Sequence, residues 1–146
     1  GWQTNGIITV QGGFPFNVTV SGDPANTGSS NERPNLIGTP TANCGDGHLT
    51  GCISKSAFEL PQKFTYGNAG RNILYGPGLA SVDFSLFKNF AVTERFRLQV
   101  RGEAFNIFNH PSFSNPSAVV DTPSFGNITS TSNNNRQLQL AAKVIF

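Results

Sequence analysis

Charge is scarce in this chain, and so are long apolar runs. Charged residues make up 12% of its 146 residues, roughly half the share found in typical soluble domains. No apolar run approaches the roughly 20 residues that a membrane-spanning helix needs. The formal net charge of +2 is too small to favour a nucleic acid as partner. These shortages argue against a helical membrane protein and against a nucleic-acid-binding protein.

Methionine is absent, and Trp and Tyr are rare. The chain has one Trp and two Tyr but 13 Phe, and only 37% of its residues are hydrophobic. Much of the remainder is Asn, Ser, Thr and Gly, a composition typical of β-rich secreted, fibrous or outer-membrane proteins. Because the chain starts at Gly1 without Met, we expect it to be a processed form or a piece of a longer protein. The lack of a signal peptide therefore says nothing about its compartment.

The clearest pattern that is present lies between Thr93 and Asn109. Residues alternate there between two kinds over ten positions, as in a strand with two unlike faces. A helix would mix the two kinds at Leu98 and Gln99, and Gly102 would weaken its middle. The pattern predicts a strand over residues 95–108. Its polar side carries Arg95, Arg97, Gln99, Arg101 and Glu103, and its apolar or small side carries Phe96, Leu98, Val100, Gly102 and Ala104.

Similar alternation predicts three more strands, over residues 2–20, 79–90 and 136–146. The segments 21–78 and 109–135 are rich in Gly, Pro, Asn and Ser, which predicts two long loops. The remaining link, Ala91 to Glu94, is short. We therefore expect one all-β segment over residues 1–146, with antiparallel amphipathic strands and long loops.

The order of the links is informative, because long and short links alternate along the chain. A transmembrane β-barrel has short periplasmic turns, long external loops, an apolar outer face and a polar interior. A soluble sandwich shows the same alternation along its strands but has no reason to sort its loops by length. The pattern favours part of a barrel wall, in which Arg97, Arg101 and Glu103 are candidates for lining the lumen.

Four runs of the sequence are similar to a known family. GWQTNGIITVQGGFPFNV, ERPNLIG, GNAGRNILYGPGLASVDFSLFKNFAVTERFRLQVRGEAFNIFNHPSF and RQLQLAAKVIF resemble the C-terminal part of TonB-dependent outer-membrane receptors, especially the Oar-like group with a carboxypeptidase regulatory domain. The resemblance implies a barrel of about 22 strands with an N-terminal plug, importing substrates with energy from TonB. This chain would supply about four of the strands and would have no transport activity alone.

The resemblance also implies partners, a compartment and an assembly signal. The partners are the remaining strands and plug of the parent, lipid, the barrel-assembly machinery, and TonB acting through the parent. The compartment is the bacterial outer membrane. The end of the chain resembles the signal that the assembly machinery reads, although a second aromatic is common where Ala142 or Val144 stands. The residues of this signal are Leu138, Leu140, Ala142, Val144 and Phe146.

Two cysteines lie in the first long loop, in CGDGHLTGC. A disulfide between Cys44 and Cys52 suits an oxidising compartment. The alternative is a metal site made by both cysteines with His48 and Asp46. That spacing matches no established zinc pattern, so the sequence favours the disulfide.

No motif in the chain predicts an enzyme. His110 has no nucleophile or acid near it in sequence, and no G-x-S-x-G setting appears. We expect neither catalysis nor a cofactor or metal. The rival to a barrel wall is an extracellular β-rich subunit, derived from such a receptor, that assembles with its own copies into fibres. Its open sheet edges and its weakly charged, Asn- and Phe-rich composition favour that assembly.

Overall fold

The computed structural model describes residues 1–45 and 47–146 and shows an all-β chain. No helix within these residues is long and apolar enough to cross a membrane. The chain divides into two compact units, which corrects the expectation of a single segment. The sheet unit comprises Gly1–Gln11, Leu79–Ser112 and Ser132–Phe146, and the loop unit comprises Gly12–Gly78 and Phe113–Thr131.

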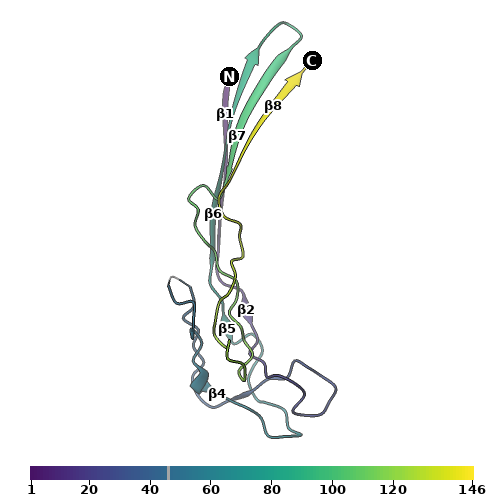
Figure 1. Ribbon diagram of the computed structural model, residues 1–146, viewed down its shortest axis with the longest axis vertical. Coiled ribbons are helices and arrows are strands. Elements are labelled where there is room, and N and C mark those ends of the chain that lie inside the picture. Colours follow the sequence, from purple (N-terminus) through teal and green to yellow (C-terminus); the bar gives the residue numbers. More distant parts are fainter. Residues whose placement is uncertain (46) are drawn as a thin grey trace. The chain divides into compact units, whose positions relative to one another are not determined.

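The sheet unit is built on one antiparallel sheet of four strands in the order β1-β6-β7-β8. Figure 1 shows both termini at the same end of the sheet as the β6–β7 link. We call this the hairpin end, and the opposite end, where the longer links leave the sheet, the long-link end. The strands are β1 (Trp2–Gln11), β6 (Leu79–Ala91), β7 (Arg97–Phe105) and β8 (Gln137–Ile145).

The first strand is shorter than predicted, because it ends at Gln11 and not at residue 20. Two glycines follow it, and an added Cβ at Gly13 would overlap the backbone carbonyl of Gly76. This close approach of two backbones redirects the chain. Residues Pro15–Phe16 then form β2, which pairs with β5 (Leu74–Tyr75) in a separate small sheet.

The third strand of the sheet is also shorter than predicted. β7 occupies residues 97–105 of the expected 95–108 and stops where Asn106 adopts a left-handed φ of 48°. The hairpin link before it is closed by the Phe96 carbonyl, which accepts hydrogen bonds from the Val92 and Thr93 N–H groups at 3.0 and 3.1 Å. The link therefore covers residues 92–96, where the sequence predicted 91–94.

The strand register sorts the side chains of the sheet by parity. Leu86 pairs with Thr4 on one side and Gly102 on the other, and Gly102 pairs with Leu140. Because side chains alternate between faces, the even-numbered residues of all four strands share one face and the odd-numbered residues share the other. This confirms the predicted antiparallel, amphipathic strands.

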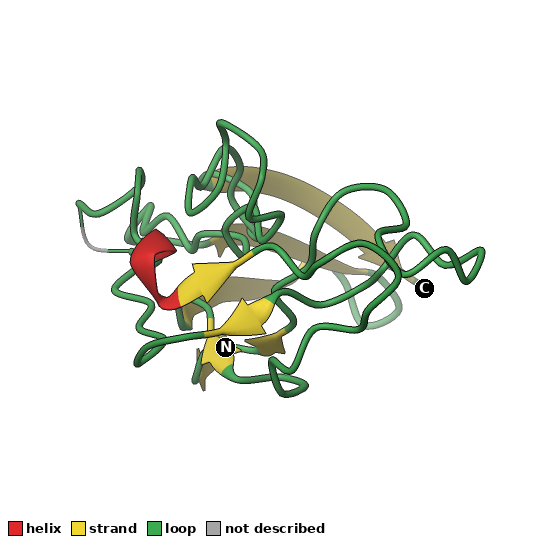
Figure 2. Ribbon diagram, turned by 90° about the horizontal axis from the view of Figure 1, so that it is seen from below, coloured by secondary structure: helices red, strands yellow, loops and turns green. Residues whose placement is uncertain are grey.

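The loop unit holds a hydrophobic core formed by both of its segments. The short strands β3 (Asn35–Leu36) and β4 (Phe58–Glu59) and the 3₁₀ helix η1 (Lys55–Ala57) lie among loops (Figure 2). The segments are joined where the Thr19 N–H bonds the Ala118 carbonyl, at 2.9 Å. Core residues include Phe16, Val18, Ile53, Ala57, Phe58, Leu74, Val120 and Phe125. The segments predicted as loops are therefore packed against each other.

Replacing Phe58 should test this core directly. Phe58 is 6% exposed and meets the Phe125 ring edge-on, with centroids 6.1 Å apart. Phe58→Ala should destabilise the loop unit by about 3–5 kcal/mol, because it leaves a cavity. Phe14→Ala is the control, since Phe14 is 61% exposed. Hydrogen exchange of the loop-unit amides measures both changes, and equal effects would contradict the described core.

Candidate functional site

The even-numbered face of the sheet is apolar and uncovered. Its large side chains are exposed along every strand, reaching 86% at Leu140 and 79% at Val10. All the buried hydrophobic residues of the described chain belong to the loop unit. Soluble monomers seldom expose so continuous an apolar patch. We call this surface the apolar face; it includes Trp2, Ile8, Val10, Val82, Phe84, Leu86, Phe90, Leu98, Val100, Leu138, Leu140 and Val144.

The length of these strands suits the thickness of a bilayer. β1 has 10 residues, and β7 and β8 have 9 each. A transmembrane β-strand needs about 9–11 residues, because each residue advances the chain by about 3.3 Å. The apolar face is thus tall enough to cross the hydrocarbon layer.

Aromatic rings and a lysine mark the hairpin end of the apolar face. Lys88 is the charged residue of this face, and its Nζ lies 4.7 Å from the Trp2 ring centroid and 5.7 Å from that of Phe90. The Phe96 and Phe146 rings meet nearby in the fold, 6.5 Å apart. Trp residues are common at membrane–water interfaces. A lysine can lie beside them, because its aliphatic chain packs on apolar surface while its ammonium group stays in water.

The odd-numbered face is polar and holds the residues predicted to line a lumen. The alternation places Arg97, Arg101 and Glu103 together on it. Arg101 lies 3.9 Å from Glu103, with side-chain exposures of 40% and 18%, so solvent screening keeps this pair weak. Gln99 donates from Nε2 to Asn89 Oδ1 at 2.9 Å. This polar face also carries Ser81, Asp83, Ser85, Gln137, Gln139 and Lys143.

The residues of the proposed assembly signal lie on β8, an edge strand. Leu138, Leu140, Ala142 and Val144 belong to the apolar face, and Phe146 follows the strand. Lys143 is the charged residue of β8. Among the described residues β8 has one partner, β7, so its outer backbone groups are open to a further strand.

A buried asparagine organises the long-link end of the sheet, and sequence reasoning missed it. Asn106 is 5% exposed. Its Nδ2 donates to the carbonyls of His110 and Asn134, at 3.1 and 3.0 Å, and its Oδ1 accepts the His110 N–H at 3.0 Å. Among residues other than Gly, Asn is one of those that most readily take a left-handed conformation. This preference is the signal by which the sequence could have indicated Asn106. His110 is held here through its backbone.

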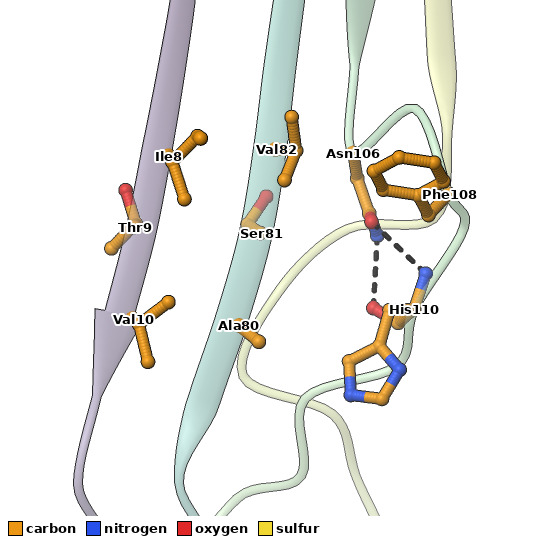
Figure 3. Close-up of a pocket in the computed structure, with 9 residues that line it drawn as sticks. All are labelled: Ile8, Thr9, Val10, Ala80, Ser81, Val82, Asn106, Phe108 and His110. Atoms are coloured by element: carbon orange, nitrogen blue, oxygen red, sulfur yellow. Dashed lines mark hydrogen bonds between the residues drawn. The ribbon is translucent and has the colours of Figure 1, made fainter.

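An apolar cavity of about 240 Å³ adjoins this turn on the apolar face. Figure 3 shows Ile8 and Val10 of β1, Ala80 and Val82 of β6, and Phe108 and His110 of the turn after β7 around it. The Asn106 amide bonds the backbone of His110, as the dashed lines show. The cavity is a notch in the apolar face.

The loop unit contains the predicted disulfide. Cys44 and Cys52 are bonded, with their Cα atoms 4.9 Å apart. The Cys52 N–H donates to the Gly126 carbonyl at 3.0 Å, which joins this small loop to the second segment of the unit. A disulfide leaves no thiolate to bind a metal, so the alternative of a site with His48 is wrong. Asp46, its fourth candidate ligand, lies outside the described residues.

A carboxylate also joins the two segments of the loop unit. Asp121 accepts hydrogen bonds from the hydroxyl and the N–H of Ser21. The Ser21 hydroxyl is the largest cause and lowers the pKa of Asp121; burial opposes it, and the Ser21 N–H lowers the pKa further. This link therefore stabilises the unit above the ordinary Asp pKa and is lost as the pH falls through the lowered value.

The comparisons with known proteins agree with the sheet geometry. The family described as "Outer membrane beta barrel domain" matches residues 1–139. The comparisons with curated proteins and with solved structures each returned no match.

The disulfide should be complete in the native protein. Thiol labelling of unreduced, denatured protein should find no reactive cysteine. Reduction should destabilise the loop unit by about 2–3 kcal/mol, since a closed loop of this size constrains the unfolded chain only modestly. The variant with Cys44→Ser and Cys52→Ser is the control and should be insensitive to reductant. Two reactive thiols before reduction would contradict the bond.

Proposed function

The chain belongs to the outer membrane β-barrel domain family, and from this premise we propose that it forms the C-terminal wall of a TonB-dependent outer-membrane transporter. Its apolar face contacts lipid and its polar face borders the water-filled interior. The chain catalyses no reaction, and transport belongs to the complete barrel. The observation that carries the proposal is the apolar face, which is exposed on all four strands, while the buried hydrophobic residues of the described chain all belong to the loop unit.

The contrast between the two units supports a lipid environment. The loop unit buries Val18, Phe58 and Leu74 to exposures of 6% or less, so this chain packs a core where its fold requires one. A soluble sandwich would cover the apolar face with a second sheet. Outer-membrane barrels have an apolar outer band and a polar interior on alternating residues, which is the arrangement that the register gives.

The links orient the sheet in this proposal. The hairpin at residues 92–96 is short, and the links between β1 and β6 and between β7 and β8 are long. In barrels of this class the short turns are periplasmic and the long loops external. The loop unit then faces the exterior, where its disulfide is stable.

The transporter class rests on the sequence resemblance. The runs around ERPNLIG and FRLQVRGEAFNIFNHPSF resemble TonB-dependent receptors, which implies that the parent supplies a plug and further strands. Further strands of the parent would pair with the open edges of β1 and β8. The barrel-assembly machinery would read the alternate residues of β8 together with Phe146.

A second candidate function is a fibre subunit, and the two open edges favour it. β1 contains neither a charged residue nor a proline, and β8 contains one lysine and no proline. Natural edge strands are usually protected by charges or prolines. Copies of the chain could therefore pair edge to edge. Electron microscopy of the native material distinguishes this function, because native fibres are expected only of a fibre subunit, whereas an excised barrel wall would present the same open edges as this chain.

The face assignment is tested by two neighbouring residues on opposite faces. Val100→Arg should cost about 2–4 kcal/mol, because it places a charge against hydrocarbon near the middle of the bilayer. Arg101→Gln, on the polar face, should cost much less. Unfolding in lipid vesicles measures both variants. Equal costs would count against a barrel wall.

The mass of the native material tests whether the chain is part of a larger parent protein. We expect intact-mass analysis of outer membranes to find this sequence inside a species far heavier than 15.6 kDa. Peptides from the digested material should include a plug and further strands. A native species of 15.6 kDa would overturn the transporter proposal and favour the fibre subunit.

A further inference from the structure

The polar face contains a small cavity whose chemistry the proposed function does not use. It measures about 230 Å³ and lies at the long-link end of the sheet. It is lined by Ser81 and Asp83 of β6, Phe105 of β7, Gln137 of β8 and the segment 133–135 before β8. We call it the polar cup.

The register places a carboxylate, an aromatic ring and an amide in one row across the cup. Phe84 pairs with Ala104, so Asp83 and Phe105 follow as the next neighbours on β6 and β7. Phe105 pairs directly with Gln137 on β8. Side chains in such a row stand about 5 Å apart. Phe105 is 40% exposed as a residue and is an apolar side chain set between two polar groups.

The walls of the cup are held by hydrogen bonds before any ligand arrives. Asp83 Oδ1 accepts the Asn106 N–H at 2.8 Å, which leaves Oδ2 available to a ligand. The Asn106 side chain bonds the Asn134 carbonyl at 3.0 Å. The carboxylate on one wall and the segment 133–135 on another are thus tied to the same buried asparagine, so little ordering is needed on binding.

We propose that the polar cup binds one ring of a neutral sugar. A partly exposed aromatic ring such as that of Phe105 suits the C–H face of a sugar ring, because the π face is negative and the C–H hydrogens are slightly positive. Asp83 accepts hydrogen bonds from hydroxyl groups, and the Gln137 amide both donates and accepts them. The cavity has room for about eight waters' volume, which suits a single ring rather than a drug-sized ligand.

Other classes of ligand fit the cup less well. The described lining residues include no Lys, Arg or His, so an anion would lack a counter-charge. Metal binding needs several ligands, and the structure shows no group of three metal-binding side chains among residues 1–45 and 47–146. An organic cation would use Asp83 and the Phe105 ring but leave the amides and the Ser81 hydroxyl unused.

The experiment uses the protein extracted from its membrane with the rest of its barrel, in detergent. Saturation-transfer NMR with D-glucose and D-galactose as probes should show transfer to the ring C–H hydrogens of at least one sugar. Phe105→Ala should weaken binding about tenfold or more, through loss of the stacking surface. Asp83→Asn keeps the acceptor for Asn106 and should also weaken binding about tenfold, because bonds to charged groups are the stronger ones.

Matched controls lie on the same face outside the cup. Phe87→Ala and Ser85→Ala should leave sugar binding unchanged, since neither residue lines the cavity. Circular dichroism checks that each variant folds, and Phe105→Leu, which keeps apolar bulk without the ring, replaces the alanine variant if that one misfolds. Absence of transfer from both sugars overturns the proposal, as do binding that survives both cup variants and preferential binding of choline.

The sugar site rests on the proposed function, because it requires a wet polar face and is tested in the complete barrel. The two ideas fail separately. If Val100→Arg destabilises the protein as predicted but neither sugar binds, the sugar-site proposal alone is overturned. Sugar binding at the cup with equal costs for Val100→Arg and Arg101→Gln overturns the barrel wall and leaves the site.

Discussion

The sheet depends on one constraint: four strands share a register that places every even-numbered residue on the same face. Each strand alone is only an amphipathic segment. Hydrogen bonding of β1 to β6, β6 to β7 and β7 to β8 turns four apolar rows into one surface. A shift of one residue in any pairing would move a row of leucines or phenylalanines to the polar face. Because the buried hydrophobic residues of the described chain all belong to the loop unit, the stability of this surface depends on what covers it from outside.

The two units of the chain solve the problem of burial in different ways. The loop unit buries its apolar side chains internally and adds covalent and charged links, namely the Cys44–Cys52 bond and the Ser21–Asp121 hydrogen bonds. The sheet unit leaves its apolar side chains outside and satisfies its backbone by pairing. At its long-link end, buried Ser112 and Asn106 hold the turns through hydrogen bonds. The loop unit therefore has a hydrophobic core of its own, and the described residues of the sheet unit contribute none of the buried hydrophobic side chains.

The parts of the fold that follow a local period could be predicted from the sequence. Alternation around Arg101 and Leu140 is visible in a few residues, so the strands and their two faces were predicted, including the shared face of Arg97, Arg101 and Glu103. The core of the loop unit could not be predicted, because Phe58 and Val120 come from segments without a period, and Val18 joins them from beyond the observed end of β1. The early end of β1 depends on contact between Gly13 and Gly76, which no local pattern records. The row of Asp83, Phe105 and Gln137 likewise requires the register of three strands.

The central claim is that the apolar face contacts lipid, and Trp2 tests it most directly. It is the one Trp of the chain, it belongs to this face, and it is 63% exposed beside Lys88. In vesicles, lipids brominated near the headgroup should quench its fluorescence strongly, measured as the difference between the native protein and Trp2→Phe. Lipids brominated at the chain ends should quench it less, because Trp2 lies at the hairpin end, near the interface. Quenching by aqueous iodide with no effect of either brominated lipid would contradict the account.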